Sequence, residues 1–337
     1  MPARRCRMPW SALRARVTVA ALVGAATLGA SGCSDGPPEP TTTTPSGRSA
    51  ATELPATPEP APTPRPTLAP RTPGTDLAPA PLPGARTVIG RFSTVSGTVD
   101  EATLTAYATM ADRAVAQVER HWTRPWSRRL TVVAPADTSA FRELVGRPDD
   151  LSQVAAVTEG PLDPTTGLAS ADRIVLNPDA FATLTTTGRQ FVLTHEGTHV
   201  AVRSSLAGAA PLWLTEGYAD HVGYSGSGRR TTELAAALLA EVDAGRGPTR
   251  LPTLADFDPA QGEIAPTYLA SWLAVDLVAR RHGAATLQRF YEASVVDGSP
   301  AQAEAATDRA FAEVLGTTRA EFTRRWLSEL ALLAGPK

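Results

Sequence analysis

The sequence predicts an α+β fold, with a mixed α/β half at residues 87–186 and an all-helical half at residues 187–337. Two patterns predict it. Short apolar, strand-like runs alternate with helical segments in the first half, whereas apolar residues recur at helical spacing through nearly all of the second. The chain has 337 residues, of which 42% are hydrophobic, so it can form a sizeable core. The histidine-containing motif HEGTH lies at the junction of the two halves.

The first half contains four predicted strands and two predicted helices. Residues 100–122 carry apolar side chains at helical spacing over several turns, which predicts a long amphipathic helix. Residues 139–146 predict a second, shorter helix. The strands are predicted at 87–95, 129–135, 152–160 and 172–178.

Helix boundaries in the second half are predicted from capping residues. The segment TGRQ (187–190) is a capping-box pattern at the start of the helix that carries HEGTH, and TRAE (318–321) is another. Pro211 and Pro266 stand where helices are expected to begin, and Gly283 where one is expected to end.

Residues 1–32 have the pattern of a signal peptide. The segment begins with five arginines and no acidic residue, and then has an apolar run at 17–30 that is too short to span a membrane. The next residues, ASGC, resemble a bacterial lipobox, although Ala30 replaces the usual larger apolar residue. We therefore expect a lipid on Cys33, which would anchor the protein on the extracytoplasmic face of the cell membrane. The alternative is ordinary cleavage and a secreted protein.

Residues 33–86 are predicted to be an extended tether rich in proline, threonine and alanine. Residues 37–83 hold half of the chain's 30 prolines and too few apolar residues to form a core. A proline-rich ligand for a partner is the alternative interpretation. Cys6 and Cys33 are the only cysteines, so no disulfide is expected in the mature chain.

The motif HEGTH predicts a metal site. His195 and His199 are four residues apart, and Glu196 directly follows the first. On an α-helix, this spacing projects both imidazoles from one face, where they can reach a single ion. Glu196 projects at the edge of that face, where it can hold a water molecule without ligating the ion. The alternative is a pair of histidines that only pack or face solvent.

A third ligand is expected because catalytic zinc usually has three protein ligands. No third histidine follows closely behind His199. Residues 211–224 predict a helix packed on the first, from which Glu216 would point inward. Asp220 lies four residues further on, where it could accept the second N–H of a ligating imidazole. His221 is the alternative ligand, although we expect it to be structural.

These residues also carry a resemblance to a known family. HEGTHV followed by WLTEGYAD resembles the gluzincin metallopeptidases, which have HExxH on one helix and a glutamate ligand in a W-L-x-E-G-x-A segment on the next. The downstream segments 268–293 and 310–330 resemble the helical tail of the peptidase MA-like group. The resemblance covers roughly residues 150–330 and implies a zincin-like fold.

The resemblance also implies roles for individual residues. It implies one Zn²⁺ per chain, with His195, His199 and Glu216 as ligands, Glu196 as general base and Asp220 as a support for a ligating histidine. Gly197 departs from the pattern, because a larger apolar residue is common there. Since glycine weakens a helix by about 1 kcal/mol relative to alanine, it suggests close backbone packing at this point.

The function implied is a membrane-tethered zinc metallopeptidase that acts on peptides or proteins of the cell envelope. Tyr268 is the candidate second donor to the oxyanion, with Tyr218 and Tyr224 as alternatives. The strand at 172–178 is the candidate sheet edge that pairs with an extended substrate.

Two other functions are considered. One is a non-catalytic zinc-binding lipoprotein of the cell envelope, against which Glu196 argues because a structural zinc needs no general base. The other is an amide hydrolase that acts on the cell wall. No basic patch of the kind that binds nucleic acid stands out, so no nucleic-acid partner is predicted.

Overall fold

The computed structural model describes residues 82–146 and 151–335. The predicted signal peptide (1–32), Cys33 and nearly all of the predicted tether lie outside the described residues. Leu82 already packs against the helical core, so the folded part begins slightly before the predicted boundary at residue 86. Within the described ranges, no helix has the length and hydropathy needed to cross a membrane.

A mixed sheet forms the N-terminal half, as predicted, with five strands instead of the predicted four, and mostly helices follow it. Strands β2, β3 and β5 run parallel, and β1 and β4 pair antiparallel at the two edges, giving the order β1-β2-β3-β5-β4. The strands are β1 (Arg86–Ile89), β2 (Ser93–Gly97), β3 (Leu130–Ala134), β4 (Ala156–Glu159) and β5 (Arg173–Leu176).

Two strand predictions were wrong. The single strand predicted at 87–95 is the hairpin β1–β2, because the chain turns at Gly90, whose N–H donates to the carbonyl of Ser93. The predicted substrate-pairing edge at 172–178 is β5, which lies between β3 and β4 and is buried along its length. β4 is the edge strand on this side of the sheet, because among the described strands it pairs with β5 alone.

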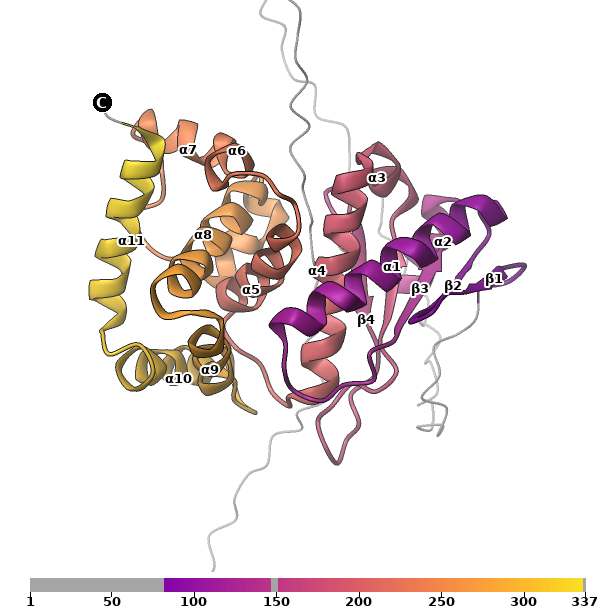
Figure 1. Cartoon of the computed structure of the whole chain (residues 1–337), viewed down its shortest axis with the longest axis horizontal. Helices are drawn as coiled ribbons and strands as arrows, with labels where there is room; N and C mark the ends of the chain where they lie inside the picture. Colours follow the sequence, from indigo (N-terminus) through magenta and orange to yellow (C-terminus); the bar gives the residue numbers. More distant parts are fainter. Residues whose placement is uncertain (1–81, 147–150, 336–337) are drawn as a thin grey trace, which may run out of the picture. The chain divides into compact units, whose positions relative to one another are not determined.

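Three helices belong to the first half of the fold (Figure 1). They are α1 (Glu101–His121), α2 (Thr138–Val145) and α3 (Pro178–Thr183). Asp100 caps α1 by accepting from the N–H of Thr103, and α1 then packs its buried apolar side chains on β2 and β3. The bounds of α1 and α2 agree with the predicted helices within one residue.

Helix α4 (Thr186–Ser205) carries HEGTH, and it begins differently from the prediction. Thr185, rather than Thr187, is the N-cap, because its hydroxyl accepts from the N–H of Gly188. The TGRQ capping box does not form, since Thr187 lies inside the helix. A capping pattern locates a helix start only to within a few residues when several threonines are adjacent.

Helix α4 is buried on nearly all sides because it lies between two apolar cores. Phe191 and Leu193 belong to the core between α4, α1 and the sheet. Ala201 and Val202 belong to the core of the helical half. A helix with this environment has no fully polar face, so the polar side chains of HEGTH are held inside the protein.

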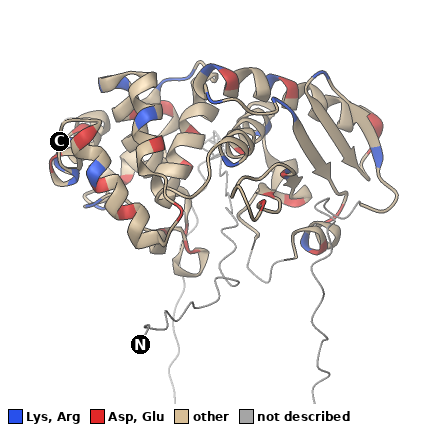
Figure 2. Ribbon diagram, turned by 90° about the horizontal axis from the view of Figure 1, so that it is seen from below, with Lys and Arg blue, Asp and Glu red and all other residues tan. Residues whose placement is uncertain are grey.

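The helical half consists of α5 (Leu212–Ser225), α6 (Thr231–Leu234), α7 (Ala236–Asp243), α8 (Ala265–His282), α9 (Ala284–Ser294), α10 (Pro300–Glu313) and α11 (Arg319–Ala334), with 3₁₀ turns at Leu254–Phe257 and Pro259–Gln261. Pro211 and Pro266 stand at the starts of α5 and α8, and Gly283 ends α8, as predicted. Thr318 caps α11 by accepting from the N–H of Glu321, but the side chain of Glu321 does not complete the predicted capping box. Figure 2 shows that acidic and basic residues are interspersed along the helices.

The contact between α5 and α8 depends on Gly217. A Cβ atom at this position would lie 2.5 Å from the carbonyl oxygen of Ser271 and 2.7 Å from its carbonyl carbon. These are backbone atoms of α8, so a side chain at residue 217 would force the two helices apart. We expect Gly217→Ala to lower the free energy of unfolding by about 1–3 kcal/mol, measured by denaturant titration.

The matched control is Gly197→Ala in α4. There the added Cβ would lie 3.1 Å from Cδ1 of Leu130, a side-chain atom that can shift, and alanine gains about 1 kcal/mol of helix propensity. This variant should therefore lose much less stability. Equal losses in both variants would show that backbone proximity at Gly217 is not the cause. Leu130 therefore lies close to the backbone of α4 at position 197, as the glycine suggested.

Candidate metal centre

Helix α4 brings two imidazoles together. His195 and His199 are one turn apart, and their Nε2 atoms are 3.0 Å from each other. Both side chains are almost completely buried, with 0% and 3% of their surface exposed. The predicted geometry of the motif is therefore present: two nitrogen atoms converge on one point from a single helix.

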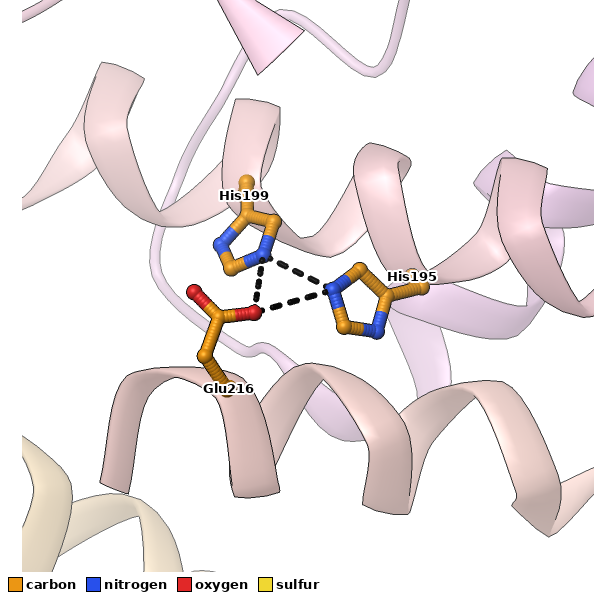
Figure 3. A group of neighbouring side chains, drawn as sticks. All are labelled: His195, His199 and Glu216. Atoms are coloured by element: carbon orange, nitrogen blue, oxygen red, sulfur yellow. Dashed lines mark hydrogen bonds and ion pairs between the residues drawn. The ribbon is translucent and has the colours of Figure 1, made fainter. Parts of the chain in front are cut away.

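Helix α5 supplies a carboxylate to the same point. Oε2 of Glu216 lies 3.3 Å from Nε2 of His195 and 3.5 Å from Nε2 of His199. Figure 3 shows the three side chains pointing toward one another. Trp213 and Leu214 anchor the start of α5 in the helical core, and this packing points Glu216 at α4. The His195, His199 and Glu216 group has its ligand atoms within 4.8 Å of one another and could hold a metal ion.

The hydrogen bonding of the group fits a metal ion. Both carboxylate oxygens of Glu216 are buried and accept no hydrogen bond within the described structure. A buried carboxylate without hydrogen bonds is costly, and a cation bound between the three side chains would lower that cost. Two imidazole nitrogens and one carboxylate oxygen are also a ligand set that catalytic zinc sites use.

The charge state of Glu216 suits a ligand. Burial alone would raise its pKa, but His199 and His195 outweigh this and hold the pKa below its usual value. Burial lowers the pKa of His199, so this side chain is neutral near pH 7. Glu216 therefore offers a negative charge and His199 an unprotonated nitrogen.

Asp220 lies behind His195, where the sequence predicts it. Its Oδ1 is 2.7 Å from Nδ1 of His195, and both side chains are buried. Burial would lower the pKa of His195, but the nearby carboxylates of Asp220 and Glu216 raise it to about 10. With a pKa of about 10, both ring nitrogens carry a hydrogen at neutral pH, so a bound ion would displace the hydrogen on Nε2 while Nδ1–H continues to donate to Asp220.

Removing the charge of Asp220 should weaken metal binding. We expect Asp220→Asn to lower the affinity for zinc by roughly 10- to 100-fold, as is typical of residues that orient a ligating histidine. Competition with a chromogenic chelator measures this affinity. The control is Asp276→Asn, since Asp276 pairs with His221 at 3.4 Å in a separate contact. Wild-type affinity in Asp220→Asn would show that Asp220 does not tune the site.

Glu196 is buried beside the group but contacts a different element. Its Oε2 accepts a hydrogen bond of 2.6 Å from Oγ1 of Thr158 on β4, while its Oε1 is buried and has no partner in the described structure. Burial raises the pKa of Glu196 to about 7. A carboxylate with a pKa in this range can both accept and release a proton at neutral pH.

The remaining candidate residues lie elsewhere. His221 pairs with Asp276 and is not part of the three-residue group, in line with the structural role expected for it. Tyr268 is buried in the first turn of α8, with its ring against Phe257. Tyr224 stacks on Phe191 at 4.2 Å. The oxyanion-donor role of Tyr268 stays a prediction.

No family model matches the chain, and no curated protein matches it significantly. What the site can bind therefore follows from its geometry. Buried polar side chains converge on one point from two helices, and the carboxyl group of Glu196, with a pKa raised to about 7, lies beside them.

Sequence reasoning missed Thr158. Nothing in the segment around it marks a functional residue, because its neighbours form an ordinary strand pattern. Its significance comes from the pairing of β4 with β5, which places Thr158 under α4. The buried hydroxyl is thus a feature of the tertiary structure alone.

Proposed function

We propose that this protein is a zinc-dependent metallopeptidase of the gluzincin type. The observation that carries the proposal is the convergence of His195, His199 and Glu216, together with the buried carboxylate of Glu196 in the same helix. The arrangement of α4 between the sheet and the helical half supports a zincin-like fold. The HEGTH and WLTEG motifs, which resemble those of gluzincins, are the segments that form the site.

In this proposal, the residues of the chain hold the ion and move a proton. A zinc ion held by His195, His199 and Glu216 would polarise the scissile carbonyl and lower the pKa of a water molecule. Glu196 accepts a proton from the attacking water on its free oxygen and delivers it to the leaving amine. Burial of Glu196 favours its protonated form, which assists the acceptance of a proton from water.

The substrate in this proposal is a peptide or protein of the cell envelope. β4 replaces β5 as the candidate strand for pairing with an extended peptide, because it is the edge of the sheet next to α4. Tyr268 is the proposed second donor to the oxyanion, and Tyr218 and Tyr224 are the alternatives. An amide of the cell wall is another substrate that the same chemistry would hydrolyse.

One observation favours a second function. His195, Glu196 and Glu216 have 0% of their surface exposed, whereas a catalytic site must admit its substrate. A non-catalytic, zinc-binding lipoprotein of the cell envelope needs no such access. A peptidase with this structure has to open the site before a peptide enters.

Cleavage of a peptide library by the purified protein tests the proposal. Hydrolysis by the wild-type protein, lost on chelation of the metal and in Glu196→Gln, would support a peptidase. Zinc bound in the wild-type protein without cleavage of any peptide would favour the second function. Adding cell-wall fragments to the library separates a cell-wall amidase from a peptidase.

The proposed location is the extracytoplasmic face of the cell membrane, through a lipid on Cys33. This follows from the signal-like residues 1–32 and the ASGC segment. Cys33→Ser should move the protein from the membrane fraction to the soluble or secreted fraction, as detected by fractionation and immunoblotting. A variant that stays with the membrane would show that Cys33 is not the anchor.

A further inference from the structure

We propose that Thr158 is a positioning residue for Glu196, holding Oε2 so that Oε1 is the oxygen that exchanges protons with water and the leaving group. This inference rests on the proposed function, in which Glu196 is the general base. It adds a residue of β4, outside both helices of the metal site, to the residues on which turnover depends.

The contact between Thr158 and Glu196 is short and fully buried. Oγ1 of Thr158 lies 2.6 Å from Oε2 of Glu196 and 3.2 Å from the backbone oxygen of the same residue. A hydroxyl carries one hydrogen and can donate to one acceptor at a time. The shorter distance is typical of a charge-assisted O–H···O bond, so the hydrogen goes to Oε2.

The two oxygens of Glu196 are therefore not equivalent. Oε2 accepts from Thr158, whereas Oε1 is buried and without a partner among the described residues. An unsatisfied buried acceptor typically costs about 1–3 kcal/mol, more when it is charged. A group that donates to Oε1 during turnover would relieve this cost. That group is the attacking water molecule in the proposed function.

Thr158 is well suited to hold a carboxylate in place. Its side chain is branched at Cβ, which restricts its own rotation, and its strand is paired with β5 along its length. Glutamate has several rotatable bonds, and fixing them in advance reduces the entropy lost on reaching the transition state. A hydrogen bond from a rigid strand to one oxygen orients the other.

A merely structural role has to be distinguished from this one. Thr158 also approaches the backbone of α4, so its hydroxyl could simply tie β4 to the helix. Thr307 is the matched control, since its hydroxyl is also fully buried and donates to the carbonyl of Ala303 at 2.8 Å in α10. Thr307→Val removes a buried threonine hydroxyl far from α4 in the sequence and outside the proposed machinery.

The test compares purified full-length wild-type protein with Thr158→Val, Thr158→Ser and Thr307→Val. We expect Thr158→Val to retain zinc and KM while kcat falls roughly 10- to 100-fold, the range for residues that orient a group in a metal site. Thr158→Ser, which keeps the hydroxyl, should restore most of kcat. Thr307→Val should lower thermal stability without changing kcat.

Crystal structures of the wild-type and Thr158→Val proteins provide a readout independent of activity. The inference requires one orientation of the Glu196 carboxylate in the wild-type protein and a rotated or mixed orientation in the valine variant. An unchanged carboxylate, or an unchanged kcat in Thr158→Val, would overturn it. If the wild-type protein cleaves no substrate, the proposed function fails, and the crystal structures still decide whether Thr158 positions Glu196.

Discussion

Replacing Glu196 with glutamine is expected to lower kcat by roughly 100- to 10,000-fold, the usual contribution of a general base, while zinc stays bound. Glutamine has nearly the same shape and can still accept from Thr158, but it cannot take a proton from water. None of the three candidate ligands changes. Steady-state kinetics on a cleaved library peptide, with metal analysis of the same preparation, measures both quantities.

The control for this substitution is Glu304→Gln on α10. Glu304 forms a surface ion pair with Arg319 at 2.6 Å, far along the sequence from α4, so this change should leave kcat unaltered. Wild-type kcat in Glu196→Gln would exclude Glu196 as the general base. Loss of zinc from that variant would instead mean that Glu196 helps to hold the ion.

The raised pKa of Glu196 also predicts a pH dependence. Burial raises this pKa from 4.5 to about 7, so the side chain is protonated, and unable to accept a proton, below that pH. We expect kcat/KM of the zinc-loaded protein to rise with pH and to level off at or below about pH 7. A bound cation would shift this rise to lower pH by favouring the charged carboxylate. A profile that falls from pH 5 to 7 would contradict the assignment.

Replacing Glu216 with alanine is expected to lower zinc affinity by more than about 100-fold, because even residues behind the ligands contribute about 10- to 100-fold. The change removes the only candidate ligand contributed by α5 to the described group and leaves two histidines. Zinc should then no longer raise the melting temperature, whereas it should raise that of the wild-type protein. His199→Ala should have the same effect. Thermal melts with and without zinc, after chelation, measure the difference.

His221→Ala is the matched control for the metal prediction. His221 lies on the same helix as Glu216 and is the alternative third ligand that the sequence offers. In the structure it pairs with Asp276. Zinc binding should survive in this variant. If zinc were retained in Glu216→Ala and lost in His221→Ala, the third ligand would be His221 and the geometry of the proposed site would be wrong.

Much of the helical structure was predictable because its signals are local. The periodicity of residues 100–122 locates α1, and Pro211, Pro266 and Gly283 mark helix ends through their own backbone preferences. Strand order is not a local property. The pattern of residues 172–178 fits a buried strand, but nothing within the segment tells whether another strand pairs on each side.

The candidate site likewise contains residues that local sequence signals predict and one residue, Thr158, that they do not. The spacing of His195, His199 and Glu196 predicts their common helix, and the sequence context of Glu216 predicts that it faces them. The structure places these side chains together. Thr158 was not predictable, since its contact with Glu196 joins residues 38 positions apart through the packing of an edge strand on α4.

By itself, the sequence determined the α/β and helical halves, the helix that presents two histidines on one face, and the candidate residues for the metal site. Periodicity, capping and spacing act within one or two turns of chain, so they can be read without a structure. Only the tertiary structure decided that β4 is the edge strand, that the group of His195, His199 and Glu216 is buried, and that the hydroxyl of Thr158 donates to Glu196. These features depend on which distant segments pack together. That packing is favoured because it buries the apolar side chains of the two hydrophobic cores.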